Sequence, residues 1–205
     1  IIPHGALHYL PMNALHDGSR HLIDSFSIRM MPSANAMKYL QDKHPDRSGG
    51  ILAFGNPDLG NPDHDLAFAQ NEAREVARER KESLVFLRKD ATEAALRKYG
   101  SGYAYIHFAT HGIFNPETPL KSALFLAPDA QYNGILTVDK LYSLQLNANL
   151  VTMSACETGL GLIANGDDLI GLARGFFYAG ASAIVSSLWK VDDLSTSYLM
   201  TRFYS

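Results

Sequence analysis

The sequence has little of several features that would assign it to a narrow class. It contains one cysteine, Cys156, among 205 residues, so an intrachain disulfide and a multi-cysteine zinc site are both excluded. Neither sign of charge dominates: the chain has 18 Lys and Arg residues and 21 Asp and Glu residues, which gives a net charge of −3. A nucleic-acid-binding domain usually carries a basic excess on one face, so we expect no nucleic acid among the partners.

Long apolar runs are also missing. The longest, residues 175–189, contains three serines and lies between Arg174 and Lys190; a bilayer-spanning helix needs about 20 apolar residues. No basic segment followed by an apolar one opens the chain, as a signal peptide would. We therefore expect a cytoplasmic protein with no membrane partner. The first residue is Ile1, and the last seven residues have a helical pattern without a cap, which suggests a piece of a longer protein.

What is present is typical of one globular domain over residues 1–205, with 46% hydrophobic residues and enough length for a sizeable core. Short apolar runs alternate with amphipathic patterns. We expect strands within 51–54, 83–87, 103–109, 148–153 and 181–189, and helices over 71–82, 92–99 and 168–179. The charges of the 71–82 helix are expected to form a solvated face.

The three later strands are apolar without alternation, which is typical of parallel strands covered on both faces. Strands that alternate with helices predict a doubly wound α/β fold, with a mostly parallel sheet and helices on both faces. Asp17-Gly18 lies between two apolar stretches and predicts a hairpin turn. An antiparallel N-terminal hairpin extension is therefore expected before the main sheet.

Reactive side chains follow two of these strands. His111 comes after the strand within 103–109, and Cys156 comes after the strand within 148–153. Ligands bind beyond the carboxyl ends of strands in an open α/β sheet, so parallel strands would bring the imidazole and the thiol to one edge. An isolated cysteine at a strand end is more often a buried apolar residue. The matching histidine makes a nucleophilic role an equal alternative.

A cysteine peptidase needs a thiolate, a histidine that transfers the proton, and donors for the developing oxyanion. Cys156 and His111 would supply the first two. The backbone N–H groups of Gly112 and Cys156 are candidates for the oxyanion hole, because each lies where a strand gives way to a loop. Gly112 also lets the backbone approach a substrate carbonyl closely.

The segments around these two residues resemble the two signatures of the CHAT domain, a caspase-like peptidase domain commonly joined to tetratricopeptide (TPR) repeats. The resemblance covers nearly the whole chain, and the similar segments are distributed along it. They are Ala109-Thr-His-Gly112 with Phe114-Asn-Pro116, Ser154-Ala-Cys-Glu-Thr-Gly159, Pro3-His-Gly5, Gly55-Asn-Pro-Asp58, Ala91-Thr-Glu93, Leu169-Ile-Gly-Leu-Ala-Arg174, Tyr178-Ala-Gly-Ala181, Ser187-Leu-Trp189 and Asp192-Asp193.

The resemblance implies a relative of caspases, separases and gingipains, with the caspase-like fold. It implies a cysteine endopeptidase in which Cys156 forms an acyl-enzyme and His111 polarises the scissile carbonyl or protonates the leaving amine. No cofactor or metal is implied. The partners implied are a protein substrate and a TPR or other regulatory region. The alternative is a regulatory or scaffolding CHAT module without activity unless a partner triggers it.

Four further residues are candidates for substrate binding. Glu157 and Asp168 could line a pocket for a basic side chain, although an acid at the start of a helix such as 168–179 can simply cap it. Ser187 and Trp189 end the last strand, and a similar Ser-Trp segment of caspases pairs with the substrate backbone. Trp189 could equally be an ordinary core residue.

Two other motifs point elsewhere and are weaker. His107 and His111 would be about 13 Å apart on a strand, too far to share a zinc ion, so a buried, hydrogen-bonded His107 is expected. Residues 159–164 fit the G-x-G-x-x-G/A pattern of dinucleotide-binding domains, but Asn165-Gly166 interrupts the helix that should follow. A flexible loop beside the nucleophile is the better interpretation.

Overall fold

The structure is a computed structural model. It describes residues 1–205 except 5, 6, 8, 9, 32, 36, 38–48, 114, 116, 117, 155, 158–166 and 188–190, and it leaves the side chains of 119, 156, 157 and 167–170 undescribed. The predicted Trp189 and the glycine-rich segment 159–164 therefore lie outside the described residues. So do the side chains of Cys156, Glu157 and Asp168.

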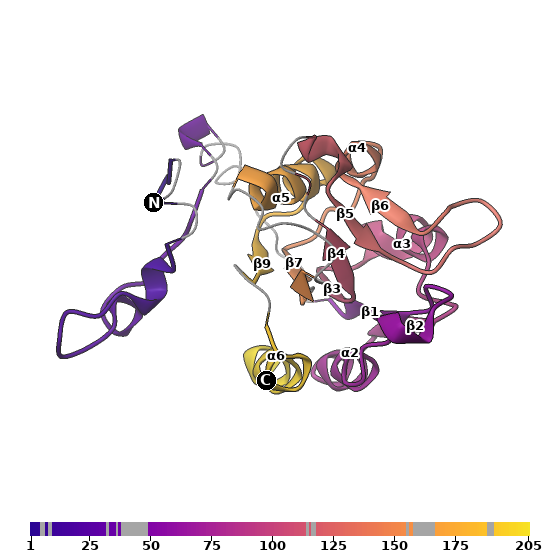
Figure 1. Ribbon diagram of the computed structural model, residues 1–205, viewed down its shortest axis with the longest axis horizontal. Helices are drawn as coiled ribbons and strands as arrows, with labels where there is room; N and C mark the ends of the chain where they lie inside the picture. The colour runs from indigo at the N-terminus through magenta and orange to yellow at the C-terminus, as the bar shows by residue number, and fades with distance from the viewer. Residues whose placement is uncertain are drawn as a thin grey trace.

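A five-stranded sheet forms the centre of the molecule, and every neighbouring pair of its strands is parallel (Figure 1). The strand order is β2-β1-β3-β7-β9. The bounds are β1 Ile51–Pro57, β2 Leu84–Arg88, β3 Tyr105–Ala109, β7 Leu150–Met153 and β9 Ile184–Ser186. This confirms the predicted parallel sheet, and each of the five predicted strand regions overlaps one of these strands.

Helices cover both faces of this sheet, which confirms the α/β architecture with a mostly parallel sheet that the caspase-like resemblance implied. Helices α2 (Ala69–Arg78) and α6 (Asp193–Tyr204) lie side by side on one face. Helices α3 (Glu93–Tyr99), α4 (Val138–Leu141) and α5 (Asp167–Ala179) lie towards the other face (Figure 1). Side chains alternate along β1 accordingly: Ala53 packs with the α2 cluster, whereas Leu52 and Phe54 enter the larger core beneath α3 and α5.

A second, smaller sheet lies beyond the carboxyl ends of β3 and β7. Its order is β6-β5-β4-β8, with bounds β4 His111–Ile113, β5 Ala123–Phe125, β6 Ile135–Thr137 and β8 Cys156–Glu157. Strands β4 and β8 are parallel, whereas β5 is antiparallel to β4 and to β6. The sequence patterns did not predict this sheet, because strands of two or three residues carry no periodicity.

The predicted helix signals correspond to observed caps. The Thr92 hydroxyl accepts a hydrogen bond from the Ala95 amide at the start of α3, and Gly180, with a φ of 114°, ends α5 in the left-handed region that favours glycine. The 71–82 prediction was displaced: α2 spans 69–78, because the chain must turn before β2 begins at Leu84.

The N-terminal turn predicted at Asp17-Gly18 is present in a minimal form. The Asp17 carboxylate accepts from the amides of Ser19 and Arg20, and Gly18 has a φ of 102°. The hairpin is limited to one antiparallel bridge between His16 and His21. Across the described part of the chain, none of the helices combines the length and apolarity needed to cross a membrane.

Candidate active site

His111 and Cys156 are brought into register by the sheet itself. Phe108 lies opposite Met153 in the β3–β7 pair. Three residues after Phe108 and three residues after Met153, His111 lies opposite Cys156 in the parallel β4–β8 pair. The backbone thus places the two predicted catalytic residues side by side at the carboxyl edge of the main sheet, as expected for adjacent parallel strands.

One hydrogen bond fixes the tautomer of the His111 imidazole. Its Nε2 lies 2.6 Å from the backbone carbonyl oxygen of His64. A carbonyl oxygen only accepts hydrogen bonds, so Nε2 carries the hydrogen and Nδ1 keeps its lone pair in the neutral ring. The ring is buried, at 7% exposure, and Nδ1 has no hydrogen-bond partner among the described residues. Nδ1 is therefore the ring nitrogen left to accept a proton.

The loop that carries the His64 carbonyl is held at both of its ends. At the end of β1, the buried Asn56 side chain accepts a hydrogen bond of 3.0 Å from the Leu66 amide. Arg88, the last residue of β2, donates to the Asp65 carboxylate and to the Asn56 carbonyl. These contacts connect the acceptor of His111 to the two strands β1 and β2.

The environment of His111 lowers the pKa of its imidazole below the ordinary value of 6.5, chiefly because burial disfavours the charged ring. The hydrogen bond to His64 and the negative charges of Asp193 and Asp65 act in the opposite direction. Asp193 begins α6 and accepts a hydrogen bond of 2.8 Å from the Phe68 amide. Burial outweighs these effects, so the lowered pKa favours the neutral imidazole at pH 7.

The backbone positions of four other predicted residues are described. Gly112 lies in β4, opposite Glu157 of β8 and Leu124 of β5. Asp168 lies in the first turn of α5. The half-buried Ser187 directly follows β9, the last described strand on its side of the main sheet. Among the described residues no three His, Cys, Asp or Glu side chains are grouped to hold a metal ion.

The other histidine of this region has a separate role. His107 is fully buried on β3, and its Nε2 lies 2.9 Å from the Glu72 carboxylate on α2, which confirms the predicted buried, hydrogen-bonded His107. Glu72 is an exception to the expected solvated face of the helix, because its side chain is only 2% exposed. The Tyr204 ring of α6 packs edge-on against His107.

Sequence reasoning missed two groups close to the pair. A backbone carbonyl, here that of His64, leaves no mark in the residue type. Ser154, two residues before Cys156, has a buried hydroxyl with no hydrogen-bond partner among the described residues. A serine beside a predicted nucleophile is a visible signal, but the burial of its hydroxyl could not be deduced from the sequence.

A cavity of about 280 Å³ adjoins His111. It lies between the 58–66 loop on one side and β5, β6 and the chain between them on the other. Its apolar lining comes from Leu59, Phe125, Leu126, Pro128 and Ile135. The site thus combines a neutral buried imidazole, the backbone position of a single thiol and an adjacent apolar cavity.

Comparison with known proteins gives two matches. A segment of 71 residues is 32% identical to tetratricopeptide repeat protein 28 of Mus musculus, which corresponds to 35% of this chain and 3% of that protein. The segment is thus a very small part of that relative. The family model of the CHAT domain matches residues 1–205. The chain, matched over its whole length, therefore belongs to the CHAT domain family.

Proposed function

We propose that this CHAT domain is a cysteine endopeptidase that cleaves protein substrates with Cys156 as nucleophile and His111 as general base and acid. The observation that carries the proposal is the register of β4 and β8, which sets the two residues opposite each other. The Nδ1 atom of His111, buried and without a partner among the described residues, adds a proton acceptor.

The chemistry follows from this arrangement. Nδ1 accepts the thiol proton of Cys156, and the sulfur adds to the scissile carbonyl carbon. The backbone N–H groups of Gly112 and Cys156 are the proposed donors to the oxyanion. His111 returns the proton to the amine nitrogen as the C–N bond breaks, which leaves a thioester. A water molecule then gives its proton to His111 and attacks the thioester, and the sulfur leaves with a proton from His111.

Binding of an extended substrate is proposed to use β9. This strand lies at the end of the described sheet, and an edge strand can accept another strand through its backbone groups. Ser187 and Trp189 would continue that pairing, and Glu157 and Asp168 remain proposed contacts for a basic side chain. A TPR region is proposed as the regulatory partner, because the curated relative is named as a TPR protein.

The single cysteine makes the test direct, because alkylation can occur at Cys156 alone. We expect iodoacetamide to label the wild type well below pH 8, and the change His111→Ala to slow labelling. The variant His21→Ala, at an exposed histidine of the N-terminal segment, is the matched control. Equal labelling of wild type and His111→Ala would contradict the dyad.

Cleavage is tested separately with a library of blocked peptides, by mass spectrometry of the products. We expect cuts by the wild type that disappear in Cys156→Ala. Normal His111-dependent labelling together with an absence of Cys156-dependent cuts would favour the alternative, a regulatory or scaffolding module that depends on a partner.

A further inference from the structure

The apolar cavity beside His111 lies on a defined side of the site. Across the small sheet the order of strands is β8, β4, β5 and β6. Cys156 is on β8 and His111 is on the neighbouring β4, whereas the cavity residues Phe125 and Ile135 come from β5 and β6. The cavity therefore extends from His111 in the direction away from the nucleophile.

This direction has a chemical meaning. In the acyl-transfer reaction the carbonyl carbon bonds to the cysteine sulfur, while the histidine protonates the departing amine. The residue that follows the scissile bond is thus held at the histidine, on the side away from the sulfur. A cavity that begins at His111 and continues over β5 and β6 is placed to receive the side chain of that residue.

The lining determines the chemistry of the occupant. None of the described lining residues is Asp, Glu, Lys or Arg, so a charged side chain would be desolvated there without a partner. The volume of about 280 Å³ lies just below the range of roughly 300–1,000 Å³ typical of pockets for drug-sized ligands. It is suited to one aliphatic or aromatic side chain.

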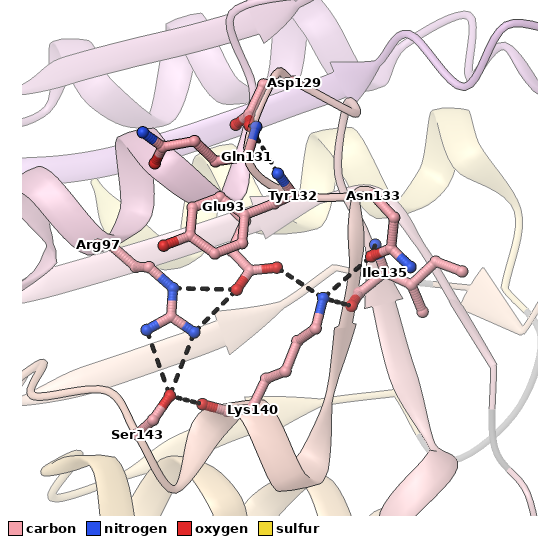
Figure 2. A network of polar contacts seen from close by, with 9 residues as sticks. All are labelled: Glu93, Arg97, Asp129, Gln131, Tyr132, Asn133, Ile135, Lys140 and Ser143. Atoms are coloured by element: carbon pink, nitrogen blue, oxygen red, sulfur yellow. Dashed lines mark hydrogen bonds and ion pairs between the residues drawn. The ribbon is translucent and has the colours of Figure 1, made fainter.

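The far wall of the cavity is held in place before any substrate arrives. Lys140 donates hydrogen bonds of 2.8 to 3.0 Å to the Asn133 side chain, to the Ile135 carbonyl and to the buried Glu93 carboxylate. Figure 2 shows how these groups surround the ammonium group. Gly134, between the two wall residues, has a φ of 77°. A Cβ atom at Gly134 would approach the Leu126 carbonyl oxygen to 2.3 Å, so the turn requires glycine.

We propose that the cavity lined by Leu59, Phe125, Leu126, Pro128 and Ile135 is the subsite for an apolar side chain on the residue that follows the scissile bond. The role of the cavity as a substrate subsite rests on the proposed peptidase function. The binding of an apolar amine beside His111 does not depend on turnover. The proposed subsite predicts that protein substrates are cut immediately before Leu, Ile, Met, Val or Phe.

The binding test uses leucinamide, which carries the amine and side chain of a leaving group. We expect saturable NMR shifts of the His111 imidazole and the Ile135 methyl signals, with much weaker effects from glycinamide or lysinamide. The change Ile135→Glu, at a position 37% exposed, should abolish the leucinamide effect. The matched control Leu120→Glu alters an exposed leucine outside the cavity lining and should leave it intact. No shift with leucinamide, or equal shifts with glycinamide, would overturn the proposal.

The cleavage arm uses the peptide library. We expect apolar residues to be enriched directly after the cut in the wild type, and Ile135→Glu to move that preference towards Lys and Arg. Labelling of Cys156 with iodoacetamide should still be slowed by His111→Ala in the Ile135→Glu background, which separates a specificity effect from loss of the dyad. If the residues directly after the wild-type cuts were random or mostly charged, the proposal of an apolar subsite would be wrong. If the wild type makes no Cys156-dependent cut, the peptidase proposal fails, and the amide titration still decides the cavity.

Discussion

His111 and Cys156 lie opposite each other in the parallel pair of β4 and β8. The same register sets Phe108 opposite Met153 in the main sheet. The alignment of the candidate dyad is therefore a property of two core strands that continue past the sheet edge. A one-residue slip of β7 against β3 would displace Cys156 from His111 and move the buried Met153 out of its position in the core. Stability of the core and alignment of the site thus depend on the same pairing.

Removing the charge of Asp193 should change the acidity of His111. The negative charge of Asp193 raises the His111 pKa, against the larger lowering by burial, so Asp193→Asn should lower this pKa further. NMR titration of the imidazole signals measures it. The control is Asp192→Asn, at an exposed neighbouring carboxylate whose capping role asparagine can keep. An unchanged or raised His111 pKa in Asp193→Asn would contradict the proposed coupling.

Glu72 should contribute to stability well beyond the other acids of α2. Its side chain is buried against His107, so Glu72→Ala leaves the buried imidazole without that partner. We expect a loss of about 1–3 kcal/mol in the free energy of unfolding, measured with urea. Glu79→Ala, at an exposed position after the helix, should change stability by less than about 0.5 kcal/mol. Similar losses of unfolding free energy in both variants would contradict a specific stabilising role for the Glu72–His107 contact.

Lys140 should stabilise both the core and the cavity wall. The Glu93 side chain is fully buried and is paired with Arg97 and Lys140, as Figure 2 shows. Lys140→Met removes one of the two cations, and we expect it to lower the free energy of unfolding by about 1–3 kcal/mol and to weaken leucinamide binding. Lys89→Met, which changes an exposed lysine, should do neither. Unchanged leucinamide binding in Lys140→Met would show that the wall is held by other contacts.

Tyr204 should make the protein sensitive to alkaline pH. Burial raises the pKa of this phenol from 10.0 to about 12. The unfolded chain loses the proton first, so the stability contributed by the buried neutral phenol is complete below pH 10. It is lost as the pH rises from 10 to about 12, by roughly 2 to 3 kcal/mol over the window. Tyr204→Phe, which also loses the hydrogen bond to Thr152, should be less stable at pH 8 but show a shallower decline above pH 10. An equally steep loss of stability above pH 10 in the wild type and in Tyr204→Phe would contradict the assignment of the alkaline sensitivity to Tyr204.

The main sheet could be predicted from the sequence because its inner strands, β1, β3 and β7, are buried on both faces. Residues such as Ile106 and Val151 are fully buried, and continuous apolar runs of this length are typical of parallel strands with helices on either side. The helix caps at Thr92 and Gly180 were equally predictable, since each depends on the chemistry of one residue.

The small sheet and the surroundings of His111 could not be predicted in the same way. Strands β4, β5 and β6 span three residues each, which is too short for a periodic pattern. Only their pairing with neighbouring strands identifies them as strands. The burial of Glu72 depends on the position of α2 over β3, which a helical pattern does not reveal. The cavity is formed by segments far apart in the chain, such as those of Leu59 and Ile135, so only the folded structure brings its lining together.

The acceptor of the His111 hydrogen bond is the main chain of residue 64. Substitution at this position changes the side chain without removing the oxygen that orients the imidazole. Insertion or deletion between Asn56 and Leu66 would instead displace that oxygen. Among related chains we therefore expect the length of this loop to be constrained more strongly than its residue types. A comparison of sequences alone would then reveal the two proposed catalytic positions and miss the carbonyl group that orients the imidazole.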